Sequence, residues 1–237
     1  MAAAAAACAG GAQPAASEAF PLSKGSTWTY RAVLKEKAVR EAAREKTTVW
    51  TMEVLDVTRQ GTTTIALVKG YPEDAKDRMA ADGPQTSAIV MDTGSRGSVY
   101  RLLDPPTALE LWRSAAGGST EWRGVVAEHS RAILETPFTI GEGFASERVS
   151  SQRAGFDSWI VTSTTPARLD DVKGDVPSGA RTEFILNRGL NKGETTVGFV
   201  PGIGIVSYAY EGYAGVPPDE STWSGSFTLT ELHRGRP

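Results

Sequence analysis

The residues that could do chemistry in this chain are few, and the most specific pattern among them is Asp92-Thr93-Gly94-Ser95, which follows the apolar residues Ile-Val-Met. Aspartic proteases place such a motif around each of two carboxylates that share one proton, because like charges about 3 Å apart cannot both ionise. The chain has no second Asp-Thr-Gly or Asp-Ser-Gly, so this chemistry would require a dimer. Asp, Gly and Ser are also common turn residues. We therefore interpret the motif as a turn between two strands, and an enzyme acting through Asp92 is our least favoured hypothesis.

Other catalytic and metal-binding arrangements lack their parts. The only histidines are His129 and His233, without a His-Glu-x-x-His motif, and the single cysteine, Cys8, has no second cysteine for a disulfide or a thiolate site. The acids of the loop 170–175 do not have the spacing of an EF-hand. The glycine-rich segment 198–206 leads into a strand-like segment, whereas a dinucleotide loop must open a helix. We predict no catalytic residue, no metal and no cofactor.

The first nineteen residues are alanine-rich and lack the large apolar side chains that a packed core requires. Within them, the small residues from Ala5 to Gly10 around Cys8 resemble the lipobox of a bacterial lipoprotein signal followed by a flexible tether. The alternative is an alanine-rich tail with an incidental cysteine. The resemblance implies that residues 1–19 are a signal remnant and tether, and that the protein lies in the periplasm or cell envelope. No run approaches the roughly 18 apolar residues of a membrane span, so we expect any membrane attachment to be a lipid on Cys8.

Length and charge limit the domain number and the partners. The 237 residues exceed the usual size of one domain, but all-β domains of about 200–250 residues commonly fold as one unit. We therefore expect residues 20–237 to form a single β domain. The formal net charge is −3 and no segment concentrates basic residues, so there is no electrostatic reason to expect nucleic acid as a partner. The oligomeric state stays open.

An eight-residue pattern, Pro-apolar-x-x-Gly-x-x-aromatic, occurs as PLSKGSTW at 21–28 and again as PFTIGEGF at 137–144. Proline suits an extended approach, glycine permits a turn with positive φ, and the aromatic residue opens an alternating segment. Each copy therefore predicts the start of a strand. The copies lie about half the chain apart, which indicates two related halves beginning near residues 20 and 136.

From residue 20 onward the dominant period is two, which is typical of half-buried strands. Trp28 and Tyr30 share one side of an early strand, and Tyr208 and Tyr210 share one side of a late strand. A curved sheet could direct both aromatic rows toward one concave face. We predict that these four residues line a site for an apolar small molecule or lipid. The alternative is that they fill the core, because aromatic rows serve either purpose.

Four other segments carry local signals. A proline start and apolar spacing predict a helix over 105–115, and the valines of EWRGVVAE at 121–128 predict a strand. The charged segment 35–46 fits either a short helix or the end of a long hairpin. Polar residues predict a loop at 170–180.

Two motifs resemble a widespread group of bacterial extracytoplasmic proteins, often lipoproteins, of undefined biochemical role. The opening FPLSKGSTWTYR at 20–31 matches their Pro-Leu-x-x-Gly-x-x-Trp-x-Tyr pattern, and FVPGIGIVSYAYEG at 199–212 matches their late Pro-Gly-x-Gly motif. By looser analogy such proteins look like curved antiparallel sheets of the LolA/LppX type, whose concave face binds acyl chains. That analogy concerns the fold and carries function only weakly.

We therefore predict an all-β fold with minor α content, in which one curved antiparallel sheet or half-barrel is built of two related halves. A β-sandwich is the alternative. The leading functional hypothesis is an exported, non-catalytic envelope protein that binds an apolar ligand or lipid in the concave sheet. A structural or protein-interaction lipoprotein is the rival hypothesis.

Overall fold

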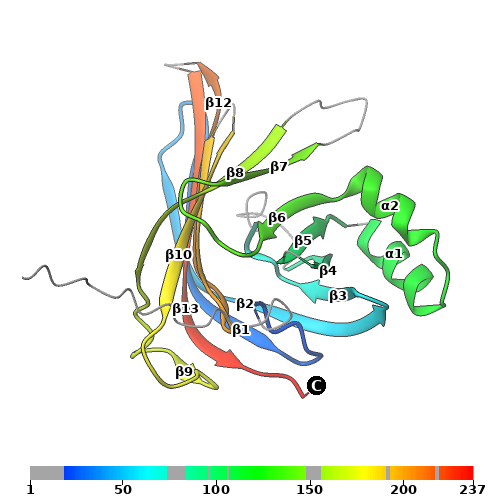
Figure 1. The fold of residues 1–237 in the computed structure, drawn as a ribbon. Coiled ribbons are helices and arrows are strands. Elements are labelled where there is room, and N and C mark those ends of the chain that lie inside the picture. Colours follow the sequence, from blue (N-terminus) through cyan, green and yellow to red (C-terminus); the bar gives the residue numbers. More distant parts are fainter. Residues whose placement is uncertain are drawn as a thin grey trace, which may run out of the picture.

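Figure 1 shows the computed structural model of the chain, which describes residues 19–73, 84–95, 97–105, 107–147, 156–190, 193–216 and 219–236. The first half of the sheet contains β1 (Thr27–Lys37), β2 (Arg44–Gln60), β3 (Thr63–Lys69), β4 (Thr86–Gly94), β5 (Gly97–Leu103) and β6 (Arg131–Glu135). The second half contains β7 (Gly143–Glu147), β8 (Phe156–Pro166), β10 (Thr182–Leu190), β11 (Gly193–Val200), β12 (Gly204–Val216) and β13 (Asp219–His233). The short β9 (Lys173–Gly174) and the helices α1 (Thr107–Ala116) and α2 (Trp122–His129) complete the fold.

One continuous hydrogen-bonded sheet follows the chain as a meander. Its order is β6-β5-β4-β3-β2-β1-β13-β12-β11-β10-β8-β7, with β9 pairing in parallel with β13 off this path. The first and last strands pair antiparallel, from Thr27 beside His233 to Lys37 beside Thr222. The sheet curls strongly, so that its two edge strands, β6 and β7, lie near each other (Figure 1). The prediction of an all-β curved sheet is confirmed. The described strands form one sheet, whereas the alternative prediction, a β-sandwich, would have two.

The two copies of the eight-residue pattern form the same local structure. Gly25 and Gly141 have φ values of +80° and +84°, a region that favours glycine. In both copies the residue after the glycine donates its N–H to the carbonyl three positions earlier, as in a type II turn. Each glycine N–H then donates to a valine carbonyl on the neighbouring strand, Val54 or Val161, at 2.8 Å. The predicted turns at the two strand starts are therefore confirmed.

The two motifs that carry the family resemblance pack against each other. The indole Nε1 of Trp28 donates to the Ile203 carbonyl oxygen at 2.6 Å. Gly204 has φ of +101°, and a Cβ at this position would lie 2.6 Å from the ring of Phe20. The glycine is required because the backbone of the late motif passes directly over this ring.

The inner face of the sheet is filled by one large hydrophobic cluster, to which all four predicted ligand-lining aromatics belong. A second, smaller cluster lies on the outer face of β3, β4 and β5, where α1 and α2 cover it (Figure 1). The indole Nε1 of Trp122 in α2 donates to Gln60 Oε1 at 3.1 Å and ties the helix pair to β2. The curved sheet thus buries its concave face by itself and part of its convex face with helices.

Three local predictions need correction or completion. The predicted strand at 121–128 is the helix α2, because Trp122 and Val126, one helical turn apart, both pack into the outer cluster. The segment 35–46 is the end of the long β1–β2 hairpin. The predicted 170–180 loop contains the two-residue strand β9. The helix predicted at 105–115 is confirmed as α1.

At the N-terminus, Ala19 is buried and its carbonyl accepts a hydrogen bond from the Gly202 N–H at 2.9 Å. The expected boundary of the tether at residue 19 therefore falls inside the packed domain. Cys8 and the rest of the predicted tether lie outside the described residues.

Candidate functional site

The four aromatic residues predicted to line a ligand site lie in the packed interior. No more than 5% of Trp28, Tyr30, Tyr208 or Tyr210 is exposed. The two rows face the same side of the sheet, and the ring of Phe227 lies 6.1 Å from Tyr208 and 6.3 Å from Tyr30. Here they form a packed core and not an open wall. Contact of these residues with a ligand stays a prediction.

A hollow lies at the gap between the edge strands β6 and β7, which we call the seam. β6 and β7 are neighbours in space, but no described ladder of hydrogen bonds joins them. At the Glu135 end of β6 the seam opens into a cleft of about 600 Å³, which we call the seam cleft. Its apolar walls are Val99 of β5, Pro137, Phe144 of β7 and Val161 of β8. The cleft therefore lies between the two halves of the sheet, at the place where no described backbone hydrogen bonds connect them.

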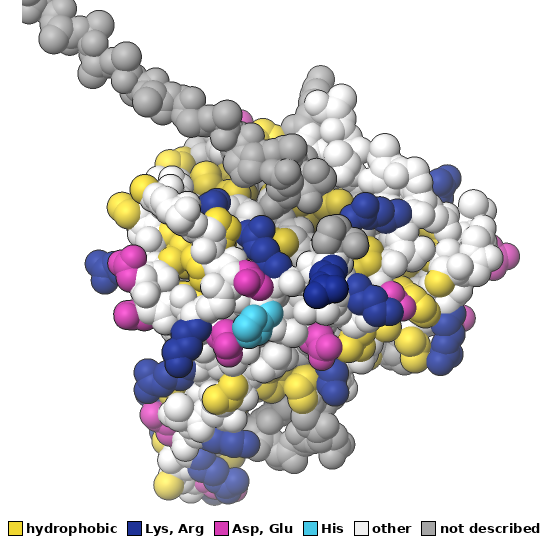
Figure 2. Space-filling view, turned by 90° about the horizontal axis from the view of Figure 1, so that it is seen from below, with side chains coloured by type: hydrophobic (Ala, Val, Ile, Leu, Met, Phe, Trp, Pro, Cys, Tyr) yellow, Lys and Arg dark blue, Asp and Glu magenta, His cyan; other side chains and the backbone are white. Residues whose placement is uncertain are grey.

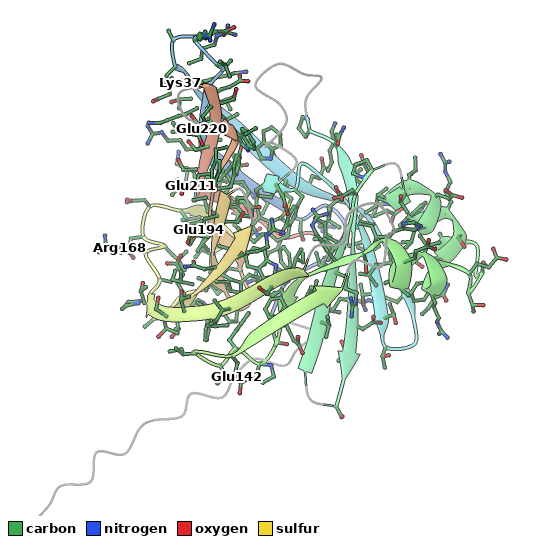
Figure 3. The ribbon with its side chains drawn as sticks, turned by 90° about the horizontal axis from the view of Figure 1, so that it is seen from above. Lys37, Glu142, Arg168, Glu194, Glu211 and Glu220 are labelled. Carbon is green, nitrogen blue, oxygen red and sulfur yellow. The ribbon has the colours of Figure 1, made fainter. Side chains whose placement is uncertain are left out.

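Three carboxylates also border the seam cleft: Asp92, Glu135 and Glu142. Glu135 and Glu142 are exposed, and Figure 3 places Glu142 at the periphery of the molecule. Asp92 lies near the end of β4, where its Oδ1 accepts a hydrogen bond from Thr63 Oγ1 at 2.5 Å. The predicted turn begins later than the motif suggested, because β4 continues through Asp92, Thr93 and Gly94, and of the motif only Ser95 lies in the turn. The partner of Asp92 is a side chain on β3 and not the turn backbone.

Sequence reasoning missed a group of charged residues that lies inside the curved sheet near the other end of β6. Glu73 accepts hydrogen bonds from two arginines, from Arg131 Nη2 to Oε2 at 3.1 Å and from Arg188 Nη2 to Oε1 at 2.5 Å. Arg131 Nη1 also donates to both carboxylate oxygens of Asp104 at 2.6 Å. We call these four residues, together with Tyr208, the arginine cluster.

Burial sets the electrostatics of the arginine cluster. The side chains of Arg131 and Arg188 are only 5% and 2% exposed, whereas Asp104 is 52% exposed. Burial by itself would lower the pKa of Arg131, but Glu73 and Asp104 outweigh it, so the pKa is raised and the guanidinium stays charged. Burial, followed by the charge of Glu73, raises the pKa of Tyr208 well above its usual range, so its hydroxyl stays protonated.

A row of aromatic rings connects the arginine cluster with the seam cleft. The Arg188 guanidinium lies 4.9 Å from the ring centre of Trp159, and this ring stacks at 6.5 Å on Phe144, a wall of the seam cleft. Arg188 could have been noticed in the sequence, because it continues the inward alternation of Phe184 and Leu186 on β10. Glu73 carries no comparable signal, since it lies in a loop.

The outer face of the sheet carries dispersed charge. A shallow hollow of about 380 Å³ lies on β1, β11, β12 and β13, and Tyr210 is among the residues that border it. Two other lining residues, Glu194 of β11 and Glu211 of β12, lie directly opposite each other on these neighbouring strands. Figure 3 shows these two glutamates in one row with Lys37 and Glu220. On the face seen in Figure 2, basic and acidic side chains are interspersed. Among the described residues, no group of three or more His, Cys, Asp or Glu side chains could hold a metal ion.

Comparisons with known proteins give little guidance. No family model and no curated protein matches the chain. Two solved structures overlap with 90% of it at 12% identity: a candidate exported protein with a YmcC-like fold from Bacteroides fragilis, at a TM-score of 0.38 over 98% of that chain, and a candidate lipoprotein from Parabacteroides distasonis, at 0.33 over 97%. Likeness at this level carries no argument about function. No described helix has both the length and the hydrophobicity to cross a membrane.

Proposed function

We propose that this protein is a non-catalytic, exported envelope protein that holds an apolar ligand or lipid in the seam cleft. The observation that carries the proposal is the position of the cleft between β6 and β7, the two ends of the strand order in the described part of the sheet. Elsewhere the concave face is filled by its own side chains. A ligand would thus bind between the two halves of the sheet, where their edge strands face each other.

The size and walls of the seam cleft support this proposal. Its volume of about 600 Å³ falls within the roughly 300–1,000 Å³ of small-molecule sites. Val99, Phe144 and Val161 give it apolar walls from three different strands. Val161 is buried, but Val99 and Phe144 are only partly buried, and a ligand that covers their apolar surface removes that surface from water.

Export and lipid anchoring belong to the same proposal. The small residues around Cys8 resemble a lipobox, and the opening and late motifs resemble a group of extracytoplasmic proteins. A lipid on Cys8 would hold the domain at a membrane surface by a flexible tether, within reach of lipids as ligands.

The non-catalytic part of the proposal rests on Asp92. Its carboxylate is engaged by the Thr63 hydroxyl at 2.5 Å, and aspartic-protease chemistry needs two such carboxylates sharing a proton. The chain contains only one Asp-Thr-Gly.

A structural or protein-interaction role is the second candidate, and the filled interior favours it. The buried rings of Trp28, Tyr30, Tyr208 and Phe227 leave the concave face closed where the sequence placed a ligand site. In this alternative the protein would act through its outer surface and the seam cleft would stay empty.

Titration with a neutral apolar fluorophore, N-phenyl-1-naphthylamine, tests the proposed function. We expect saturable binding to the wild-type protein and its loss in Thr139→Trp, which places a large side chain in the cleft from an exposed wall position. The matched control is Ile140→Trp, because its neighbouring side chain is 58% exposed and is not part of the cleft wall. Absence of saturation in the wild type, or equal binding by both variants, would reject the seam cleft as the site.

A further inference from the structure

The aromatic wall of the seam cleft comes from an edge strand. Phe144 is the only aromatic residue among the described walls of the cleft, and its side chain is only partly buried. It lies on β7, which pairs with β8 alone in the described part of the sheet. A partly buried side chain exchanges between rotamers unless a neighbour fixes one of them. The shape of the cleft therefore depends on what holds this ring.

The indole of Trp159 packs against the Phe144 ring. The two residues lie directly opposite each other on β8 and β7, and their rings stack with centroids 6.5 Å apart and planes 20° apart. The two strands are close at this point, because a Cβ on Gly143 would lie 2.9 Å from the Trp159 carbonyl oxygen. Trp159 is only 1% exposed, so it is itself held by the interior. It thus supports the partly buried ring from inside the sheet.

Arg188 in turn packs against Trp159. Its guanidinium carbon lies 4.9 Å from the centre of the indole ring, and its Nη2 donates to Glu73 Oε1 at 2.5 Å. The planar guanidinium suits both contacts, because it can stack on an aromatic face while its N–H groups bind a carboxylate. A continuous series of contacts therefore runs from Glu73 through Arg188 and Trp159 to Phe144 in the wall of the seam cleft.

We propose that Arg188 and Trp159 are positioning residues for the seam cleft, which hold the Phe144 ring in the wall against which an apolar ligand packs. Neither of them is among the described residues that line the cleft. A wall that is already ordered favours binding, because less side-chain freedom is lost when the ligand arrives. This inference rests on the proposed function and deepens it, since it assigns a role in ligand affinity to a buried charge.

Titration of the full chain with N-phenyl-1-naphthylamine tests the role of Arg188. Arg188→Lys keeps a cation beside Glu73 but removes the planar stack on Trp159, so we expect the affinity to fall about fivefold. The matched control is Arg131→Lys, because Arg131 is also buried and donates to Glu73 but stacks on no ring in the described part of the chain. Both variants should melt at a lower temperature, and only Arg188→Lys should bind more weakly. Wild-type affinity in Arg188→Lys, or an equal loss in Arg131→Lys, would overturn the inference.

A double-mutant cycle tests whether Arg188 acts through the Phe144 ring. In the background Phe144→Leu there is no ring left to position, so Arg188→Lys should cause no further loss of affinity. The same loss in both backgrounds would show that Arg188 does not act through Phe144. Trp159→Phe, which retains a ring for stacking, should bind more tightly than Trp159→Leu. Equal affinities of these two variants would contradict a positioning role for the indole.

A measurement without ligand separates failure of this inference from failure of the proposed function. In protein labelled with 4-fluorophenylalanine, the fluorine NMR signal of Phe144 is the one that disappears in Phe144→Leu. We expect this signal to shift or broaden in Arg188→Lys and to stay unchanged in Arg131→Lys, because only the first variant frees the ring. A wild-type protein that does not bind N-phenyl-1-naphthylamine would reject the proposed function, and the NMR signal would still decide whether Arg188 positions the ring. An unchanged Phe144 signal in Arg188→Lys would reject the positioning role even if the fluorophore binds.

Discussion

Substitution of the two turn glycines gives a direct test of the repeated strand start. Gly25 and Gly141 have φ values of +80° and +84°, and an L-residue in the left-handed region costs roughly 1–2 kcal/mol. Steric clash adds nothing for alanine, because a Cβ on Gly141 meets no atom within 4 Å and one on Gly25 meets only the Gly235 Cα at 3.9 Å. We therefore expect each alanine variant to lose about 1–2 kcal/mol of unfolding free energy, and each valine variant about 1–3 kcal/mol.

The assay is urea unfolding followed by tryptophan fluorescence, with Gly124→Ala as the matched control. A Cβ on Gly124 also meets no atom within 4 Å, but this glycine lies inside α2 without positive φ. Alanine should stabilise the helix there by roughly 0.5–1 kcal/mol. Two turn variants as stable as the wild type would refute the conclusion that backbone conformation selects glycine in both copies.

Three further predictions concern pH, catalysis and anchoring. Burial raises the pKa of Tyr100 to about 12, against the opposing effect of a backbone hydrogen bond with Phe20. The unfolded chain ionises this group near pH 10, so roughly 2–3 kcal/mol of stability should be lost between pH 10 and 12, and unfolding that does not depend on pH in this window would contradict it. Asp92→Asn keeps an oxygen for the Thr63 hydroxyl, so folding should change by less than about 1 kcal/mol; acid-dependent, pepstatin-sensitive peptide cleavage that disappears in this variant would establish an enzyme instead. Expressed behind a complete export signal, the protein should partition with membranes and Cys8→Ser should release it, whereas unchanged membrane association would reject the lipid anchor.

The strands could be predicted because their faces differ in polarity. β1 buries Trp28 and Tyr30 inside and exposes Arg31, so a period of two is visible without a structure. The helix α2 could not be predicted from the sequence. Its apolar residues indicate a helix only when the apolar outer face of β3, β4 and β5, against which they pack, is known. Valines that suit a strand by propensity were thus overridden by tertiary packing.

The arginine cluster shows a different limit of sequence reasoning. The partners of Glu73 lie 58 and 115 residues away, on β6 and β10, and only the curvature of the sheet brings them together. The seam cleft is equally invisible in sequence, because it results from two edge strands that come close without pairing. The sequence predicted correctly that both aromatic rows face the inner side of the sheet. A period of two in the sequence does not distinguish an interior that is filled by side chains from one that is open to a ligand.

Native mass spectrometry of the protein, purified from its native cells, tests the proposed function most directly. We expect the wild type to carry the mass of an N-terminal lipid on Cys8 and to retain a second, apolar species that organic solvent releases. In Thr139→Trp the N-terminal lipid should remain while the second species is lost, since only the seam cleft is altered. A wild-type protein without a retained species, or the same species retained by Thr139→Trp, would contradict ligand binding in the seam cleft.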